Sequence, residues 1–228
     1  NLAIHMSRSS KDSKALNPQK DLLPLCGGDL SKDGFEEMIA KEAGVKKEDI
    51  LSYDLFLYNR MKGTTLGINE EFVAAPKLDD LECAYSSIEG MLNAKLSEDY
   101  VTMCAVFDNE EVGSGTKQGA GSTFFPEVLK RISYLSGKNE EEYYMAVADS
   151  FMLSADNAHA VHPNYQDKTD PTNRPYINEG IVLKYNASQK YTTDANSAAL
   201  VKYLCKKEKI NCQVFFNRSD MLGGSTLG

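Results

Sequence analysis

The sequence has no tryptophan, only three histidines among its 228 residues, and no long apolar run. Its most apolar stretch, residues 101–107, is far shorter than the roughly 18 residues that a membrane-spanning helix needs. The N-terminus also lacks the basic and then apolar pattern of a secretory signal. These absences predict a protein without membrane partners.

Basic charge is also scarce. The sequence has 25 Lys and Arg residues and 33 Asp and Glu residues, which gives a formal net charge of −8. This charge argues against a nucleic-acid partner, because clustered Lys and Arg drive binding to phosphates. The five cysteines include no C-x-x-C pair, which favours neither a disulfide framework nor a structural zinc ribbon. We therefore expect a cytoplasmic globular protein of one or two domains, at roughly 150 residues per domain.

From about residue 55 onward, strand-like segments alternate with helix-like segments. The pattern predicts strands at 71–75, 101–107, 151–155, 180–185 and 212–216, and helices at 78–92, 122–135, 140–150 and 194–206. This alternation is typical of an α/β fold. Residues 1–54 differ, because short apolar segments at 2–4 and 22–26 predict two strands, and a helical pattern follows within 31–49.

Three groups of carboxylates follow apolar segments, at points where the chain turns toward a helix. They are Asp79 with Asp80, Asp108 with Glu110 and Glu111, and Asp156. In an α/β sheet such positions line the crevice at the carboxyl ends of the strands, and converging carboxylates repel one another unless cations lie between them. Zinc, manganese or cobalt suits such a site. Each group alone also has a simpler interpretation, as a helix cap or a solvated turn, so the metal hypothesis depends on their joint placement.

Other chemically versatile residues surround these groups. The glycines at 113, 115, 119 and 121 match neither common phosphate-binding pattern and favour a tight turn that brings the Glu pair into a site. His159 would share a face with Asp156 on a helical turn, and Lys184 ends an apolar strand pattern. His5 and His162 have simpler structural interpretations when each is considered alone.

The motifs that carry these residues occur in one order over nearly the whole chain. They are Asn1-Leu-Ala-Ile-His5-Met, Glu71-Phe-Val-Ala-Ala-Pro-Lys-Leu-Asp79-Asp-Leu, Phe107-Asp-Asn-Glu110-Glu111-Val-Gly-Ser, Ser154-Ala-Asp156-Asn-Ala-His159-Ala-Val-His-Pro-Asn-Tyr, Gly180-Ile-Val-Leu-Lys184 with Gln189-Lys-Tyr191, and Gly223-Gly-Ser-Thr-Leu-Gly. Together they resemble the motifs of the aspartyl aminopeptidase family, which are dinuclear zinc metallopeptidases.

The resemblance implies an α/β fold with a mixed sheet flanked by helices, as in zinc aminopeptidases, and part of a smaller β-rich dimerisation domain. Residues 1–54 would be the latter part of that dimerisation domain, and residues 55–228 the central part of the catalytic domain. The family assembles as dimers built into a tetrahedral dodecamer. The resemblance therefore implies a homo-oligomer with peptide substrates.

The resemblance also implies roles for individual residues. Asp79 would bridge two divalent metal ions, Glu111 would bind one and Asp156 the other, and Glu110 would be the general base. The expected metal is Zn²⁺, with Mn²⁺ or Co²⁺ as alternatives. The peptide bond between Asp79 and Asp80 would be cis.

Four further residues match positions that contact the substrate. His159, Lys184 and Tyr191 would line the substrate pocket, where Lys184 is a candidate for binding an acidic N-terminal residue. His5 would reach from the dimerisation domain of one subunit into the active site of its neighbour.

The chain also departs from the family pattern. The family has two histidine ligands in segments that this sequence does not contain, so we expect a fragment that supplies three of five ligands. Two alternative functions stay open: a non-catalytic homologue that serves as an oligomerisation or interaction module, and a related di-metal deacylase.

Overall fold

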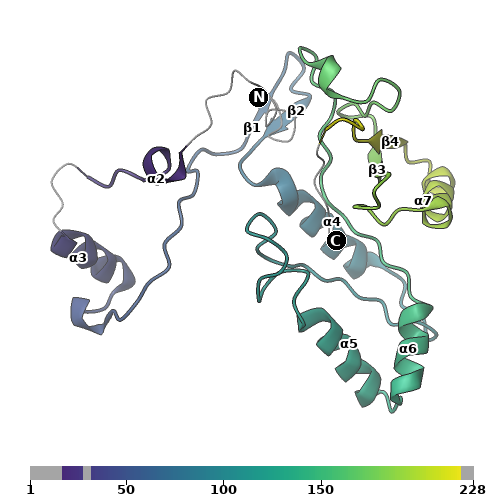
Figure 1. Cartoon of the computed structure of the whole chain (residues 1–228), viewed down its shortest axis with the longest axis horizontal. Coiled ribbons are helices and arrows are strands. Elements are labelled where there is room, and N and C mark those ends of the chain that lie inside the picture. Colours follow the sequence, from purple (N-terminus) through teal and green to yellow (C-terminus); the bar gives the residue numbers. More distant parts are fainter. Residues whose placement is uncertain (1–16, 28–31, 222–228) are drawn as a thin grey trace. The chain divides into compact units, whose positions relative to one another are not determined.

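The computed structural model describes residues 17–27 and 32–221 and forms a mixed α/β fold (Figure 1). Its residues fall into two compact units that divide between Pro76 and Lys77. The predicted strand at 2–4 lies outside the described residues. The assignment of 1–54 to a dimerisation domain and of 55–228 to a catalytic domain stays a prediction.

The first unit holds short elements. They are α2 (Pro18–Asp21), α3 (Lys32–Ala43), the 3₁₀ turn η1 (Lys47–Asp49), β1 (Thr64–Leu66) and β2 (Phe72–Ala74). The strands form an antiparallel hairpin in which Thr65 pairs with Val73, and the predicted strand at 71–75 is thereby confirmed. The predicted strand at 22–26 is wrong, because 22–27 forms no strand and its leucines are exposed.

The second unit is built around one β-α-β segment. Strands β3 (Ile181–Tyr185) and β4 (Cys212–Phe216) pair in parallel from Ile181 with Cys212 to Tyr185 with Phe216, and α7 (Ala195–Glu208) connects them. Among the described residues, the buried side chains of its core include Leu183, Ala198, Cys205 and Phe215. Gly180 permits the close approach of the two strands, because a Cβ there would lie 2.2 Å from the Asn211 carbonyl oxygen and its φ is +105°.

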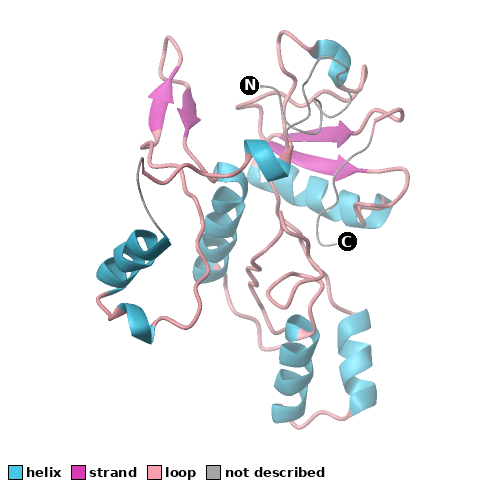
Figure 2. Cartoon of the chain, turned by 60° about the vertical axis from the view of Figure 1, so that its left-hand side comes forward, coloured by secondary structure: helices cyan, strands magenta, loops and turns pink. Residues whose placement is uncertain are grey.

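Among the described residues, the other regular elements of this unit are all helical. They are α4 (Leu78–Asn93), α5 (Phe124–Leu135), α6 (Glu140–Ala148) and the 3₁₀ turn η2 (Gln166–Lys168). The side chain of Asn139 caps α6 by accepting a hydrogen bond from the Glu142 amide at 3.0 Å, which explains why the helix begins there. Helices α5 and α6 lie side by side (Figure 2), with Lys130 placed over the ring of Tyr143.

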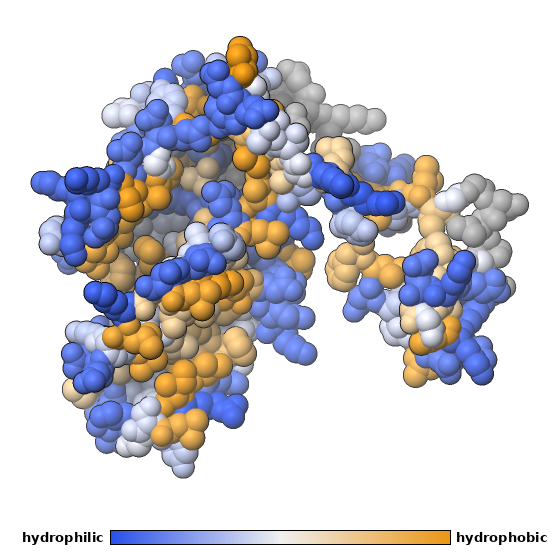
Figure 3. Space-filling model, turned by 180° about the vertical axis from the view of Figure 1, so that it is seen from behind, coloured by the Kyte–Doolittle hydropathy of each residue, from blue (hydrophilic) through white to orange (hydrophobic). Residues whose placement is uncertain are grey.

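Two further predicted strands, both in the second unit, are wrong. Residues 101–107 and 151–155 are not strands, although both are apolar. A strand exists only where a neighbouring backbone shares its hydrogen bonds, and within the described residues no strand pairs with either segment. Val101, Val106, Phe151 and Leu153 are consequently more than half exposed. Apolar side chains form patches among hydrophilic ones on the face seen in Figure 3.

Across 17–27 and 32–221, no helix combines the length and the apolar composition that a membrane span requires.

Candidate metal centre

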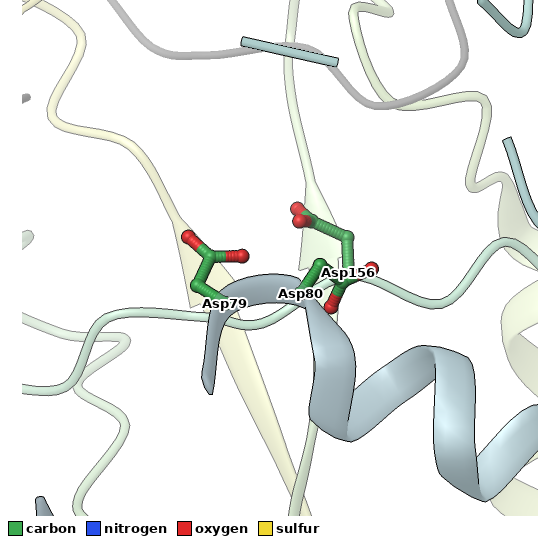
Figure 4. A group of neighbouring side chains, drawn as sticks. All are labelled: Asp79, Asp80 and Asp156. Atoms are coloured by element: carbon green, nitrogen blue, oxygen red, sulfur yellow. The ribbon is translucent and has the colours of Figure 1, made fainter. Parts of the chain in front are cut away.

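The first part of the candidate centre is a bend at the start of α4. Lys77 has a left-handed backbone with φ of +61°, and neither Asp79 nor Asp80 has helical backbone angles. The peptide bond between Asp79 and Asp80 is cis, as the family resemblance implies. The two carboxylates therefore project from an irregular turn, and α4 becomes regular only from Leu81 (Figure 4).

Asp156 supplies the second part of the centre from a loop between α6 and η2. Carboxylate oxygens of Asp79, Asp80 and Asp156 all lie within 4.8 Å of one another. Figure 4 shows the Asp156 loop crossing the bend that carries the other two side chains. The structure thus brings Asp79 and Asp156 together although 77 positions (156 − 79) separate them in sequence.

Lys184 brings positive charge to this cluster from β3. Its ammonium group pairs with the Asp156 carboxylate and donates a second hydrogen bond to the Asn157 carbonyl at 2.8 Å. The same group lies 5.7 Å from the centre of the Tyr191 ring. Burial and the charge of Asp156 raise the pKa of the Tyr191 hydroxyl, which therefore stays protonated at neutral pH.

The carboxylates repel one another despite this lysine. Burial is the largest cause that raises the pKa of Asp79, followed by the charges of Asp156, Asp80 and Glu111, while Lys184 opposes the shift. Asp80 Oδ1 is shielded from solvent and has no hydrogen-bond partner among the described residues. A divalent cation binds well to several carboxylate oxygens that lie close together, because it relieves their repulsion. The raised pKa of Asp79 and the buried Asp80 Oδ1 are consistent with this, so these residues fit a metal ion.

The Glu pair lies on the tight turn that the glycines predict. The Gly121 amide donates to the Ser114 carbonyl at 2.9 Å, and a Cβ at Gly119 would lie only 2.3 Å from the same oxygen. Glu110 and Glu111 are both exposed on this turn. The charge of Glu111 reaches Asp79, but its carboxylate is not one of the three within the 4.8 Å cluster, so the metal role of Glu111 and the base role of Glu110 stay predictions.

The histidines lie in different surroundings. His159 packs edge-on against Phe215, with 5.1 Å between ring centres. His162 accepts a hydrogen bond from the Asn164 amide at 3.2 Å, which fits a structural role. His5 lies outside the described residues.

The family resemblance gave Asp80 no ligand role, although the carboxylate pattern included it, and sequence reasoning did not connect Asn157 or Cys83 with this centre. Asp80 joins the cluster, and the adjacent pair of aspartates was the available signal. Asn157 and Cys83 join the Asp156 loop to α4, because the Cys83 thiol donates to Asn157 Oδ1 at 2.9 Å and Asn157 Nδ2 donates to the Leu78 carbonyl at 3.1 Å. Burial and the nearby negative charge of Asp80 raise the pKa of the Cys83 thiol to about 12, so it stays protonated.

Comparisons with known proteins agree with a zinc site. Residues 1–228 match a family profile described as aminopeptidase I zinc metalloprotease (M18). A relative from Clostridium acetobutylicum, named probable M18 family aminopeptidase 2, is 47% identical over 234 residues, which cover 100% of this chain and 53% of the relative. The chain thus spans about half the length of the curated relatives it matches.

Solved structures give the same result. A chain in the cryo-EM structure of the Ape4 and Nbr1 complex is similar with a TM-score of 0.79 and 33% identity, over 100% of this chain and 48% of that one. The S. cerevisiae mApe1 dodecamer is similar with a TM-score of 0.67 and 29% identity, over 80% of this chain and 43% of that one. Because the family match covers every residue, the chain belongs to the aminopeptidase I zinc metalloprotease (M18) family.

Proposed function

We propose that the protein containing this chain is a zinc-dependent aminopeptidase that removes the N-terminal residue from peptides. The observation that carries the proposal is the cluster of Asp79, Asp80 and Asp156 carboxylates within 4.8 Å, in a chain of the M18 family. The free thiols of all five cysteines support a reducing compartment, which we propose is the cytoplasm.

In this proposal Asp79, Glu111 and Asp156 would hold two divalent ions, with Asp79 as a ligand of both. Zinc, when bound, polarises the scissile carbonyl and lowers the pKa of water. The raised pKa of Asp79 supports the assignment, because a cation would relieve the repulsion that contributes to it. Mn²⁺ and Co²⁺ are the alternative ions that oxygen ligands accept.

The remaining residues bind substrate and move protons. Glu110 accepts the proton of the attacking water and passes it to the leaving amine. Lys184 favours an acidic N-terminal residue, and its contacts with Asp156 and Asn157 account for two of the three N–H donors of an ammonium group. His159 and Tyr191 line the pocket beside it.

We also propose that the protein works as a homo-oligomer of dimers, assembled as a tetrahedral dodecamer. The similarity to S. cerevisiae mApe1, which forms a dodecamer, supports this assembly.

His5 would then donate a hydrogen bond to the developing oxyanion in the active site of a neighbouring subunit. Mixing an inactive Glu110→Gln protein with an inactive His5→Ala protein restores part of the activity if subunits exchange. No recovery despite exchange would contradict this role of His5.

The proposed function is tested by comparing variants at the Glu pair. Glu110→Gln is expected to abolish aminopeptidase turnover with nearly unchanged zinc content, because the base is not a ligand. Glu111→Ala and Asp156→Ala are expected to lose zinc. Glu98→Gln, in an exposed loop, is the matched control and keeps both properties.

Three results would overturn the proposal. Equal zinc loss in the Glu110, Glu111 and Asp156 variants would contradict the division of roles. Hydrolysis of N-acyl amino acids without hydrolysis of aminoacyl substrates would identify a deacylase, and zinc binding without either activity would identify a non-catalytic homologue.

A further inference from the structure

Asn157 connects the two parts of the candidate metal centre. It directly follows Asp156, and its side chain lies against the first turns of α4. One end of its amide donates to the Leu78 carbonyl at 3.1 Å, and the other end accepts from the Cys83 thiol at 2.9 Å. These two contacts lie on either side of the cluster residues Asp79 and Asp80 in sequence.

The backbone of Asn157 is held as well. Its carbonyl accepts a hydrogen bond from Lys184 of β3 at 2.8 Å, so the residue is bonded to α4 through its side chain and to β3 through its main chain. All three bonds are partly buried. In such surroundings a hydrogen bond is stronger than in water, and an unpaired amide is costly, so the Asp156 loop has one favoured position.

The chemistry of the contacts requires an amide at this position. The protonated Cys83 thiol is a donor and needs an acceptor, whereas the Leu78 carbonyl is an acceptor and needs a donor. An asparagine supplies both groups on one planar unit. An aspartate would place an acceptor against the carbonyl and add negative charge to a cluster that already repels itself, and an aliphatic side chain would supply neither group.

We propose that Asn157 is a positioning residue for the metal centre: by bridging Cys83 and the Leu78 carbonyl, it holds Asp156 beside Asp79. The inference rests on the proposed function, in which Asp79 and Asp156 hold zinc. Residues that orient metal ligands typically change metal affinity by roughly 10- to 100-fold when they are replaced.

The test measures the zinc affinity of the folded protein by competition with a chromophoric chelator. Asn157→Leu removes both hydrogen bonds while keeping the branched shape of the side chain, and is expected to weaken zinc binding by roughly 10- to 100-fold. Asn93→Leu is the matched control, because Asn93 donates to the Glu89 carbonyl at 2.8 Å at the other end of α4. This control is expected to bind zinc like the wild type.

If Asn157→Leu does not fold, two variants of Cys83 test the same hydrogen bond from the other side. Cys83→Ala removes the donor to the amide and is expected to weaken zinc binding, whereas Cys83→Ser keeps a donor and restores most of the affinity. The visible absorption of the Co²⁺-loaded protein should change in Cys83→Ala and not in Cys83→Ser, because it reports the arrangement of the ligands.

The outcomes separate this inference from the proposed function. If Asp79→Asn loses zinc while Asn157→Leu and Cys83→Ala bind it like the Asn93 control, the positioning role is wrong and the ligand assignment stands. If Asp79→Asn keeps wild-type zinc affinity, the ligand assignment is wrong and the positioning role falls with it.

Discussion

Asp79→Asn should make the metal-free protein more stable, because it removes one charge from the carboxylate cluster with little change of shape. The carboxylate oxygens of Asp79, Asp80 and Asp156 lie within 4.8 Å of one another. Two unit charges at that distance interact by about 1 kcal/mol in water-like surroundings. Asp79 is repelled by two such neighbours and attracted by Lys184, so the net gain is about 1 kcal/mol, or a rise of about 2–4 °C in Tm.

The pH dependence follows from the raised pKa of Asp79. Folding raises this pKa, so the protonated form is favoured in the folded state, and the resulting stability is present at low pH and lost as pH rises through the raised value. Without metal, the wild type is therefore less stable than Asp79→Asn near neutral pH. The difference in Tm between Asp79→Asn and the wild type should shrink as the pH falls toward the ordinary pKa of an aspartate.

Zinc should reverse the order of stability. At a free zinc concentration of about 100 times Kd, the wild type gains about 2.7 kcal/mol from binding, which exceeds the gain from charge removal. Asp79→Asn, which lacks the bridging ligand, should gain much less.

The assay is thermal unfolding followed by circular dichroism, in EDTA and in buffered zinc, with the exposed Asp54→Asn as control. The reasoning is refuted if Asp79→Asn is less stable than the wild type without metal, or if zinc stabilises both proteins equally.

Three other predictions concern the turns and caps of the second unit. Gly119→Ala should lower both zinc content and activity, measured in the purified variant, because its Cβ would lie 2.3 Å from the Ser114 carbonyl and displace the turn that carries the Glu pair. Asn139→Ala should lower the free energy of unfolding by about 1 kcal/mol in urea titration, because α6 loses the cap that binds the Glu142 amide, and an unchanged midpoint would contradict the capping role. Hydrogen bonds from backbone amides lower the pKa of Asp170, so its ionised form stabilises the folded state. Asp170→Ala should therefore be less stable than the wild type at neutral pH, and this difference should disappear as the pH falls below the ordinary pKa of an aspartate. Thermal scans at several pH values would check this.

Local sequence signals predicted the helices well. The expected helices at 78–92, 122–135, 140–150 and 194–206 are confirmed as α4, α5, α6 and α7, within a few residues at each end. Periodic apolar positions and capping residues act within one segment, so they are readable without knowledge of the fold. The strands β2, β3 and β4 are confirmed for a related reason, since each is a short apolar run.

The strand predictions that failed have one cause. Residues 101–107 and 151–155 are as apolar as β3, yet they are not strands. Strand formation depends on a partner backbone, which a local pattern cannot specify. The same limit explains why β3 and β4, separated by α7, could be predicted singly but their register could not.

By itself, the sequence determined the α/β class, the helices, the family motifs and the carboxylates that belong to them, because all of these depend on residue identity and short spacings. Only the tertiary structure decided that Asp80 joins Asp79 and Asp156 in one cluster and that Lys184 pairs with Asp156. Only the tertiary structure likewise decided that Asn157 reaches α4 through Cys83 and Leu78. The physical reason is that the contacts from Lys184 to Asp156 and from Asn157 to α4 join residues 28 to 79 positions apart. The pKa shift of Asp79 likewise arises from burial and from charges that become neighbours only when the chain folds.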